Sequence, residues 1–158
     1  MTGQERPVRI VPMTEAHLDE VMVYEKGMFG PESWSRAAYR DELRDTRTRW
    51  YIAAVDDEDR LLGWAGLMTI ADAAQIFTVG TVPHARRQGV ARRLVEAMLD
   101  EARRRDATEV FLEVRVDNAA AKALYEGFGF RPLRIRRGYY DGGRVDAVEM
   151  RLALDGSG

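Results

Sequence analysis

The sequence predicts one α/β domain built on a mixed β-sheet. Apolar runs of strand length alternate with segments whose apolar residues recur at helical spacing, in the order β α α β β β α β α β β. Some neighbouring strands are separated by short turns and others by a helix, so both hairpins and parallel crossovers are expected. A chain of 158 residues that is 46% hydrophobic suits a single core. We therefore expect one domain over residues 1–158, with an ordered core of about 8–153.

Strands are predicted where apolar or β-branched runs are bounded by turn residues. The acidic segment 56–59 turns one strand into the next, and Pro83 stops the run that precedes the third helix. Asp141-Gly142-Gly143 is the turn of a C-terminal hairpin. The predicted strands are 8–11, 50–55, 61–70, 73–82, 109–114 and two within 130–154.

Four helices are predicted from capping residues and from apolar spacing. The first follows a Thr14 cap, and the second starts at Ser33 or Ser35 and carries Trp34. The third begins near Gly89, and the fourth covers 118–126. The apolar positions that support the first three are Leu18, Val21, Met22 and Met28, then Ala38 and Leu43, then Val90, Leu94, Val95 and Met98.

Composition excludes several classes of function. The chain has no cysteine and two histidines far apart, so we expect no disulfide, no thiolate nucleophile and no metal site. A net charge of −2 argues against a general nucleic-acid binder, which needs a basic excess. No apolar run approaches the ~20 residues of a membrane span, and the N-terminus does not resemble a secretory signal. A soluble cytoplasmic protein without membrane or nucleic-acid partners is expected.

The segment 81–94, TVPHARRQGVARRL, is a candidate anion site. A strand ends, a tight loop follows and a helix begins, which presents free backbone N–H groups and a partial positive charge. Gly89 leaves room for an anion to approach, and several arginines add charge. The alternative is a solvated, arginine-rich helix start. Neither a GxxxxGK[ST] loop nor a dinucleotide fingerprint is present.

A candidate acid–base pair lies further along the chain. Glu113 interrupts a β-like apolar alternation, and Tyr125 lies two turns into the following helix. A carboxylate and a phenol in one cleft could accept and donate a proton. Alternatively, Glu113 points to solvent from an edge strand while Tyr125 belongs to the core, and spacing alone favours this second interpretation.

These motifs together carry a family resemblance. Arg86 to Ala91 resembles the [QR]-x-x-G-x-[GA] acetyl-CoA loop of the GNAT N-acetyltransferases. LEVR at 112–115, Asn118, then ALYE and GFGF at 123–130 resemble the RimI branch, the ribosomal-protein-alanine N-acetyltransferases. The likeness extends to RRGYY at 136–140 and, less strictly, to Trp34-Ser35 and Asp146-Ala147, and covers about residues 8–153.

The resemblance implies a GNAT fold whose central sheet splays into a cleft for acetyl-CoA. It implies Glu113 as general base and Tyr125 as general acid. Residues that contact the acceptor would be Trp34, Tyr139 and Tyr140. Cofactor-binding residues would be Val79, Gly80 and Thr81 along the pantetheine arm, Arg86, Arg87, Gln88, Gly89, Val90, Ala91 and Arg92 around the pyrophosphate, and Asn118.

The activity implied is acetylation of a protein N-terminus by direct attack of its amine on acetyl-CoA. The expected acceptor is the N-terminal alanine of a small-subunit ribosomal protein. The alternatives are another peptide, a small amine, or a CoA-binding module without catalysis. Two departures from the family pattern stand out. Thr81-Val82-Pro83 replaces the usual apolar-x-V-[DN]-P, and Ser33-Trp34-Ser35 replaces Pro-Trp-Ser.

Overall fold

A computed structural model describes residues 7–154 as one seven-stranded mixed sheet in the order β1-β2-β3-β4-β5-β7-β6. The ends of the predicted domain, residues 1–6 and 155–158, lie outside the described residues. The strands are β1 (Arg9–Pro12), β2 (Arg49–Val55), β3 (Leu61–Ile70), β4 (Ala73–Thr81), β5 (Glu109–Arg115), β6 (Arg131–Tyr140) and β7 (Val145–Ala153). The α-helices are α1 (Leu18–Phe29), α2 (Arg36–Arg44), α3 (Val90–Arg104) and α4 (Ala119–Gly127). The short 3-10 helices are η1 (Glu15–His17), η2 (Gly30–Glu32), η3 (Pro83–Ala85) and η4 (Asp141–Gly143).

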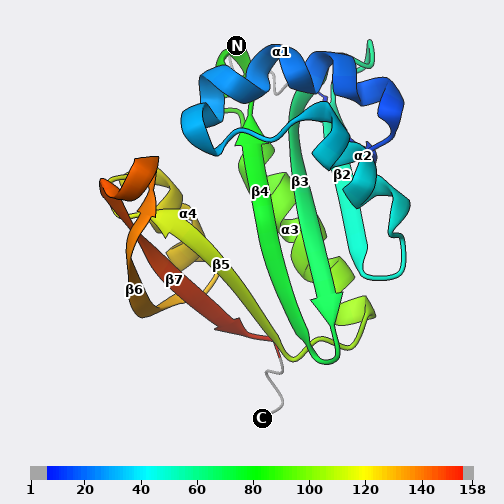
Figure 1. Cartoon of the computed structure of the whole chain (residues 1–158). Helices are drawn as coiled ribbons and strands as arrows, with labels where there is room; N and C mark the ends of the chain where they lie inside the picture. Colours follow the sequence, from blue (N-terminus) through cyan, green and yellow to red (C-terminus); the bar gives the residue numbers. More distant parts are fainter. Residues whose placement is uncertain (1–6, 155–158) are drawn as a thin grey trace, which may run out of the picture.

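The predicted element order and mixed sheet are confirmed. The amphipathic helix α3 packs its buried stripe against β2, β3 and β4, while α1 and α2 lie on the other side of these strands (Figure 1). The stripe includes Leu94, Val95 and Met98, which are fully buried. Burial of one such side chain stabilises the fold by about 1.5–3 kcal/mol, so this contact fixes α3 firmly on the sheet.

The sheet opens between β4 and β5. These two strands are parallel and pair only through Ala73–Gln75 and Glu109–Phe111, after which they diverge (Figure 1). A β-bulge lies just beyond the paired part, because Gly66 faces Thr78 whereas Leu67 faces Ile76, which leaves one extra residue on β4. Bulges bend a strand and increase its twist. The bend accompanies the separation of β4 from β5.

The structure corrects the placement of Trp34. The predicted second helix carries this residue, but α2 begins at Arg36 because the Ser35 hydroxyl accepts the backbone N–H of Ala38 at 3.1 Å. Trp34 lies in the segment before the helix, where its own N–H donates to a carboxylate oxygen of Glu25 at 2.8 Å. None of the helices in residues 7–154 combines the length and apolarity needed to span a membrane.

Candidate active site

A cavity of about 770 Å³ occupies the opening between β4 and β5. Its walls come from the end of α1 and η2, from β4, from β5 and the start of α4, and from the β6–β7 turn. The cavity brings together many residues that the sequence singled out, namely Trp34, Val79, Glu113, Asn118, Tyr125, Tyr139 and Tyr140. Residues distant in the sequence therefore share one concave site.

Glu113 lies in this site and not at an edge. Its strand β5 is flanked by β4 and β7, so the prediction of an edge strand pointing to solvent is wrong. The side chain is 8% exposed. Oε1 accepts a hydrogen bond from Gln75 Nε2 at 3.0 Å and lies 3.4 Å from the Tyr139 hydroxyl, while Oε2 is 3.3 Å from Arg136 Nη1. These contacts hold the carboxylate at the cavity wall.

Sequence reasoning missed the two partners Gln75 and Arg136. Both come from other strands, and only the register of β4, β5 and β6 brings them to the carboxylate. The guanidinium of Arg136 also lies 5.5 Å from the centre of the Tyr139 ring, in a cation–π arrangement. Burial, followed by the charge of Glu113, raises the pKa of the Tyr139 phenol. That phenol is therefore a donor at neutral pH.

Tyr125 projects from α4 and is 8% exposed. Its ring packs edge-on against Phe130, with ring centres 5.8 Å apart. Burial raises the pKa of the phenol to about 12. The hydroxyl therefore keeps its proton throughout the neutral range, which a hydrogen-bond donor to an anion requires.

The fourth helix begins at a capping asparagine. Asn118 Oδ1 accepts the N–H of Ala121 at 3.0 Å, and both residues line the cavity. The cap satisfies one donor of the first turn and fixes the direction of α4. This orientation places Tyr125, two turns further on, at the same cavity.

The loop at the start of α3 has the features of an anion site. Gly89 is the N-cap and has a left-handed backbone with φ +79°, and no side chain caps the helix there. A Cβ added at Gly89 would meet nothing within 4 Å, so the backbone is open on that side. The first-turn N–H groups of α3 remain available to a ligand. Of the other predicted cofactor residues, Arg86–Arg92 belong to this loop and the first turn of α3, whereas Gly80 and Thr81 end β4, and none of them lines the cavity.

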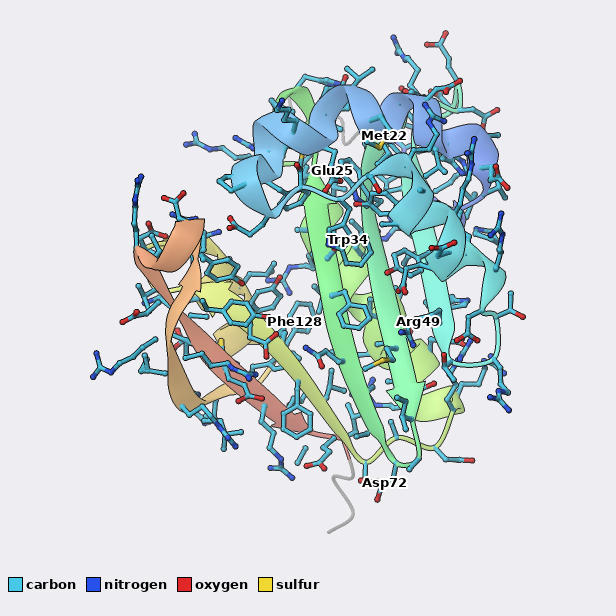
Figure 2. The ribbon with its side chains drawn as sticks, in the orientation of Figure 1. Met22, Glu25, Trp34, Arg49, Asp72 and Phe128 are labelled. Atoms are coloured by element: carbon cyan, nitrogen blue, oxygen red, sulfur yellow. The ribbon has the colours of Figure 1, made fainter. Side chains whose placement is uncertain are left out.

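Helix α1 contributes to the cavity wall a buried carboxylate, Glu25, that sequence reasoning also missed. Glu25 is 2% exposed and accepts hydrogen bonds from the Trp34 N–H at 2.8 Å and from the Tyr39 hydroxyl at 2.5 Å. Burial raises its pKa, although both hydrogen bonds oppose the shift. Figure 2 shows Glu25 and Trp34 on the α1 side of the sheet. The available signal was a charged residue at helical spacing from the buried Leu18 and Val21.

Glu25 fixes the segment that carries Trp34. The Trp34 ring packs against Tyr39 and Phe77, with centres 5.2 and 6.3 Å apart. Trp34 and the Phe77 ring of β4 therefore form an aromatic part of the cavity that Glu113 also lines. Within residues 7–154, no group of three or more histidine, aspartate or glutamate side chains is arranged to hold a metal ion.

Comparison with known proteins assigns the family. Residues 16–130 match the family model described as the acetyltransferase (GNAT) family. The chain belongs to the GNAT acetyltransferase family. It is 35% identical to the N-alpha-acetyltransferase RimI of Mycobacterium tuberculosis over 156 residues, which cover 96% of both chains.

Two further comparisons are with proteins named as ribosomal-protein-alanine N-acetyltransferases. The Escherichia coli [ribosomal protein bS18]-alanine N-acetyltransferase is 40% identical over 123 residues, covering 77% of this chain and 81% of that protein. The crystal structure of the ribosomal-protein-S18-alanine N-acetyltransferase from Escherichia coli superposes with a TM-score of 0.82 at 28% identity, covering 96% of this chain and 97% of that one. The predicted GNAT fold and the likeness to the RimI branch are confirmed. Acetyl-CoA is the acyl donor of this family.

Proposed function

We propose that this protein transfers an acetyl group from acetyl-CoA to the N-terminal amine of a protein, the acceptor being the N-terminal alanine of a small-subunit ribosomal protein. The observation that carries the proposal is the cavity at the β4–β5 opening, where Glu113 and Tyr125 face one space. The relatives named for acetylating the alanine of ribosomal protein bS18 supply the acceptor. The reaction would take place in the cytoplasm, where ribosomal proteins are made.

The residues present fit acetyl-CoA. The loop Arg86–Arg92 and the uncapped start of α3 would hold the pyrophosphate with backbone N–H groups. Beyond Gln75, β4 no longer pairs with β5, so its backbone at Val79–Thr81 can bond an extended pantetheine arm as an added strand would. Asn118, at the start of α4, would contact the same ligand from the opposite wall.

When bound, acetyl-CoA supplies the thioester carbonyl that the acceptor amine attacks. Only the neutral amine is a nucleophile, and a peptide α-amino group has a pKa of about 7.7–8.0, so a useful fraction is neutral near pH 7. Glu113 would accept, through a water molecule, the proton that the amine nitrogen loses as it forms the amide bond. A backbone N–H of β4 would polarise the carbonyl. A transfer of this kind needs no acyl-enzyme, and the chain has no cysteine.

Tyr125 would donate to the departing thiolate. With a pKa of about 12, its phenol is a weaker acid than a typical thiol, whose pKa is about 8.5. The contribution that we expect is therefore a hydrogen bond that strengthens as charge develops on sulfur, before the proton moves. Such a bond to an anion contributes about 1.5–3 kcal/mol.

The acceptor would enter between Trp34 on one wall and Tyr139 and Tyr140 on the other. The two tyrosines pack edge to face with ring centres 4.8 Å apart at the β6–β7 turn. Their rings and the Trp34 ring give the acceptor apolar faces, and Glu113 lines the same cavity. This arrangement suits a peptide whose amine points inward.

Mass spectrometry of an acceptor panel tests the proposal. The panel contains peptides that begin with alanine and with other residues, together with spermidine and an aminoglycoside, each incubated with the protein and acetyl-CoA. We expect acetylation of the alanine peptide. Transfer to the small amines alone would replace the proposal with a small-amine acetyltransferase. CoA binding without any transfer would leave a catalytically silent module.

A further inference from the structure

A second carboxylate lies directly across from Glu113. In the antiparallel pairing of β5 with β7, Glu113 is the register partner of Glu149. In the pairing of β7 with β6, Glu149 is in turn the register partner of Arg134. Register partners share one face of a sheet, with Cβ atoms about 4.5–5.5 Å apart, and two like charges in such positions destabilise the sheet. The pair of glutamates therefore needs an explanation.

Glu149 is held by charge more than by hydrogen bonds. Its side chain is 14% exposed, and Arg134 Nε lies 2.9 Å from Oε1. Oε1 is buried and accepts no well-directed hydrogen bond from the described residues, so its contact with Arg134 is an ion pair. A buried carboxylate oxygen without a well-directed donor costs stability. A residue kept at that cost beside the active site suggests a role there.

The second arginine reaches Glu113 across a small residue. Arg136 is the register partner of Ala147, whose side chain leaves room above β7 for the guanidinium to extend to β5. It ends 3.3 Å from Glu113 Oε2. Two carboxylates and two guanidiniums thus form one group on this face of β5, β7 and β6. We call Glu113, Glu149, Arg134 and Arg136 the four-charge cluster.

The charges of this cluster balance. The other polar groups that contact Glu113 are the amide of Gln75 from β4 and the hydroxyl of Tyr139 from β6. Neither carries a charge at neutral pH, since the pKa of Tyr139 is raised. A balanced cluster prevents Arg136 from giving the site a net positive charge, which would repel the ammonium form of an acceptor.

We propose that Glu149 and Arg134 are positioning residues that set the electrostatic potential at Glu113, an inference that rests on the proposed role of Glu113 as the base. Glu149 balances the second positive charge of the cluster, so that Glu113 remains an effective proton acceptor while Arg136 holds it in place. Arg134 in turn prevents Glu149 from giving the cluster a net negative charge. The two residues act on the reaction through the net charge around Glu113, and neither lines the cavity.

The two charges must then act in opposite directions. Glu149→Gln keeps the shape of the side chain but leaves the cluster with one excess positive charge. This change weakens Glu113 as a proton acceptor and disfavours approach of the ammonium. Arg134→Gln leaves one excess negative charge, with the reverse effect. A unit charge about 5 Å away changes the rate roughly fourfold if it is screened as in bulk water, and more where the screening is weaker.

The test measures kcat/KM for the alanine peptide and KM for acetyl-CoA in the two variants and in the double variant Glu149→Gln/Arg134→Gln. We expect a fall of roughly fourfold or more for Glu149→Gln, an unchanged or higher value for Arg134→Gln, and a near-wild-type value for the double variant. The KM for acetyl-CoA stays the same. Arg137→Gln is the control, because Arg137 neighbours the cluster on β6 but its side chain is 88% exposed.

The outcomes separate this inference from the proposed function. If Glu149→Gln and Arg134→Gln both lower activity, with lower thermal midpoints, the cluster is only structural and the inference is overturned. No change in either variant also overturns it. The proposed function fails separately, if the wild-type protein does not acetylate the peptide or if Glu113→Gln retains full activity.

Discussion

Replacement of Tyr125 by phenylalanine removes one hydroxyl group from the cavity and little else. The ring keeps its contact with Phe130, and burial alone, without a hydrogen-bond partner among the described residues, raises the phenol pKa to about 12. No partner is therefore left unsatisfied, and the free energy of unfolding should change by less than about 1 kcal/mol. For a chain of this size, that corresponds to at most about 2–4 °C in the thermal midpoint.

The effect on catalysis should be much larger. A hydrogen bond to the developing thiolate contributes about 1.5–3 kcal/mol, and a proton-transfer group typically contributes 10²–10⁴ in rate. We expect kcat for Tyr125→Phe to fall about 10²-fold, measured by release of free CoA thiol at saturating substrates. The affinity for acetyl-CoA, measured by calorimetry, should stay within about threefold, because the bond forms only as charge develops.

Two results would refute this reasoning. Equal kcat in Tyr125→Phe and the wild type would remove the phenol from the mechanism. A large fall accompanied by lost acetyl-CoA binding would show that Tyr125 binds the donor and does not act on the leaving group. A raised pKa adds a further expectation: ionisation of this phenol should cause no loss of activity between pH 7 and 9.

Three other predictions concern the loop, a cap and a buried carboxylate. Gly89→Val should weaken acetyl-CoA binding in calorimetry by at least tenfold, since φ +79° disfavours a branched side chain; unchanged affinity would argue against the loop site. Ser35→Ala removes the cap on Ala38 and should lower the unfolding free energy by about 1 kcal/mol in urea, with KM for acetyl-CoA unchanged. In the folded protein the pKa of Glu101 is lowered, chiefly by its hydrogen bond from Arg104. The ionised carboxylate therefore stabilises the fold above the pKa that Glu101 has in the unfolded chain, and this stabilisation is lost as the pH falls through the folded-state pKa. Glu101→Gln should therefore lose less stability than the wild type between pH 6 and 3 in urea titrations, and an identical loss would contradict this.

The strands and helices could be predicted from the sequence because their signals are local. The Thr14 and Ser35 caps, the turn at 56–59 and the apolar stripe of α3 each act within a few residues. Trp34 was misplaced because the contact that holds it outside α2 is tertiary. The Trp34 N–H donates a hydrogen bond to Glu25, which lies nine residues earlier, in α1.

The candidate site was only partly predictable for the same reason. The family motifs gave Glu113, Tyr125 and Asn118, which the structure brings to one cavity. Gln75 and Arg136 contact Glu113, and Glu149 pairs opposite it, only because β5 lies between β4 and β7, an order that differs from the order of the strands in the chain. A one-residue change in register would move these side chains to the other face. Local patterns do not determine that register.

The most direct test of the central claim uses a peptide that begins with alanine and contains one internal lysine. The protein is incubated with this peptide and acetyl-CoA, and tandem mass spectrometry locates the acetyl group. The account predicts acetylation on the terminal α-nitrogen, with the product strongly reduced in Glu113→Gln. Acetyl on the lysine side chain, or equal product from both proteins, would contradict it.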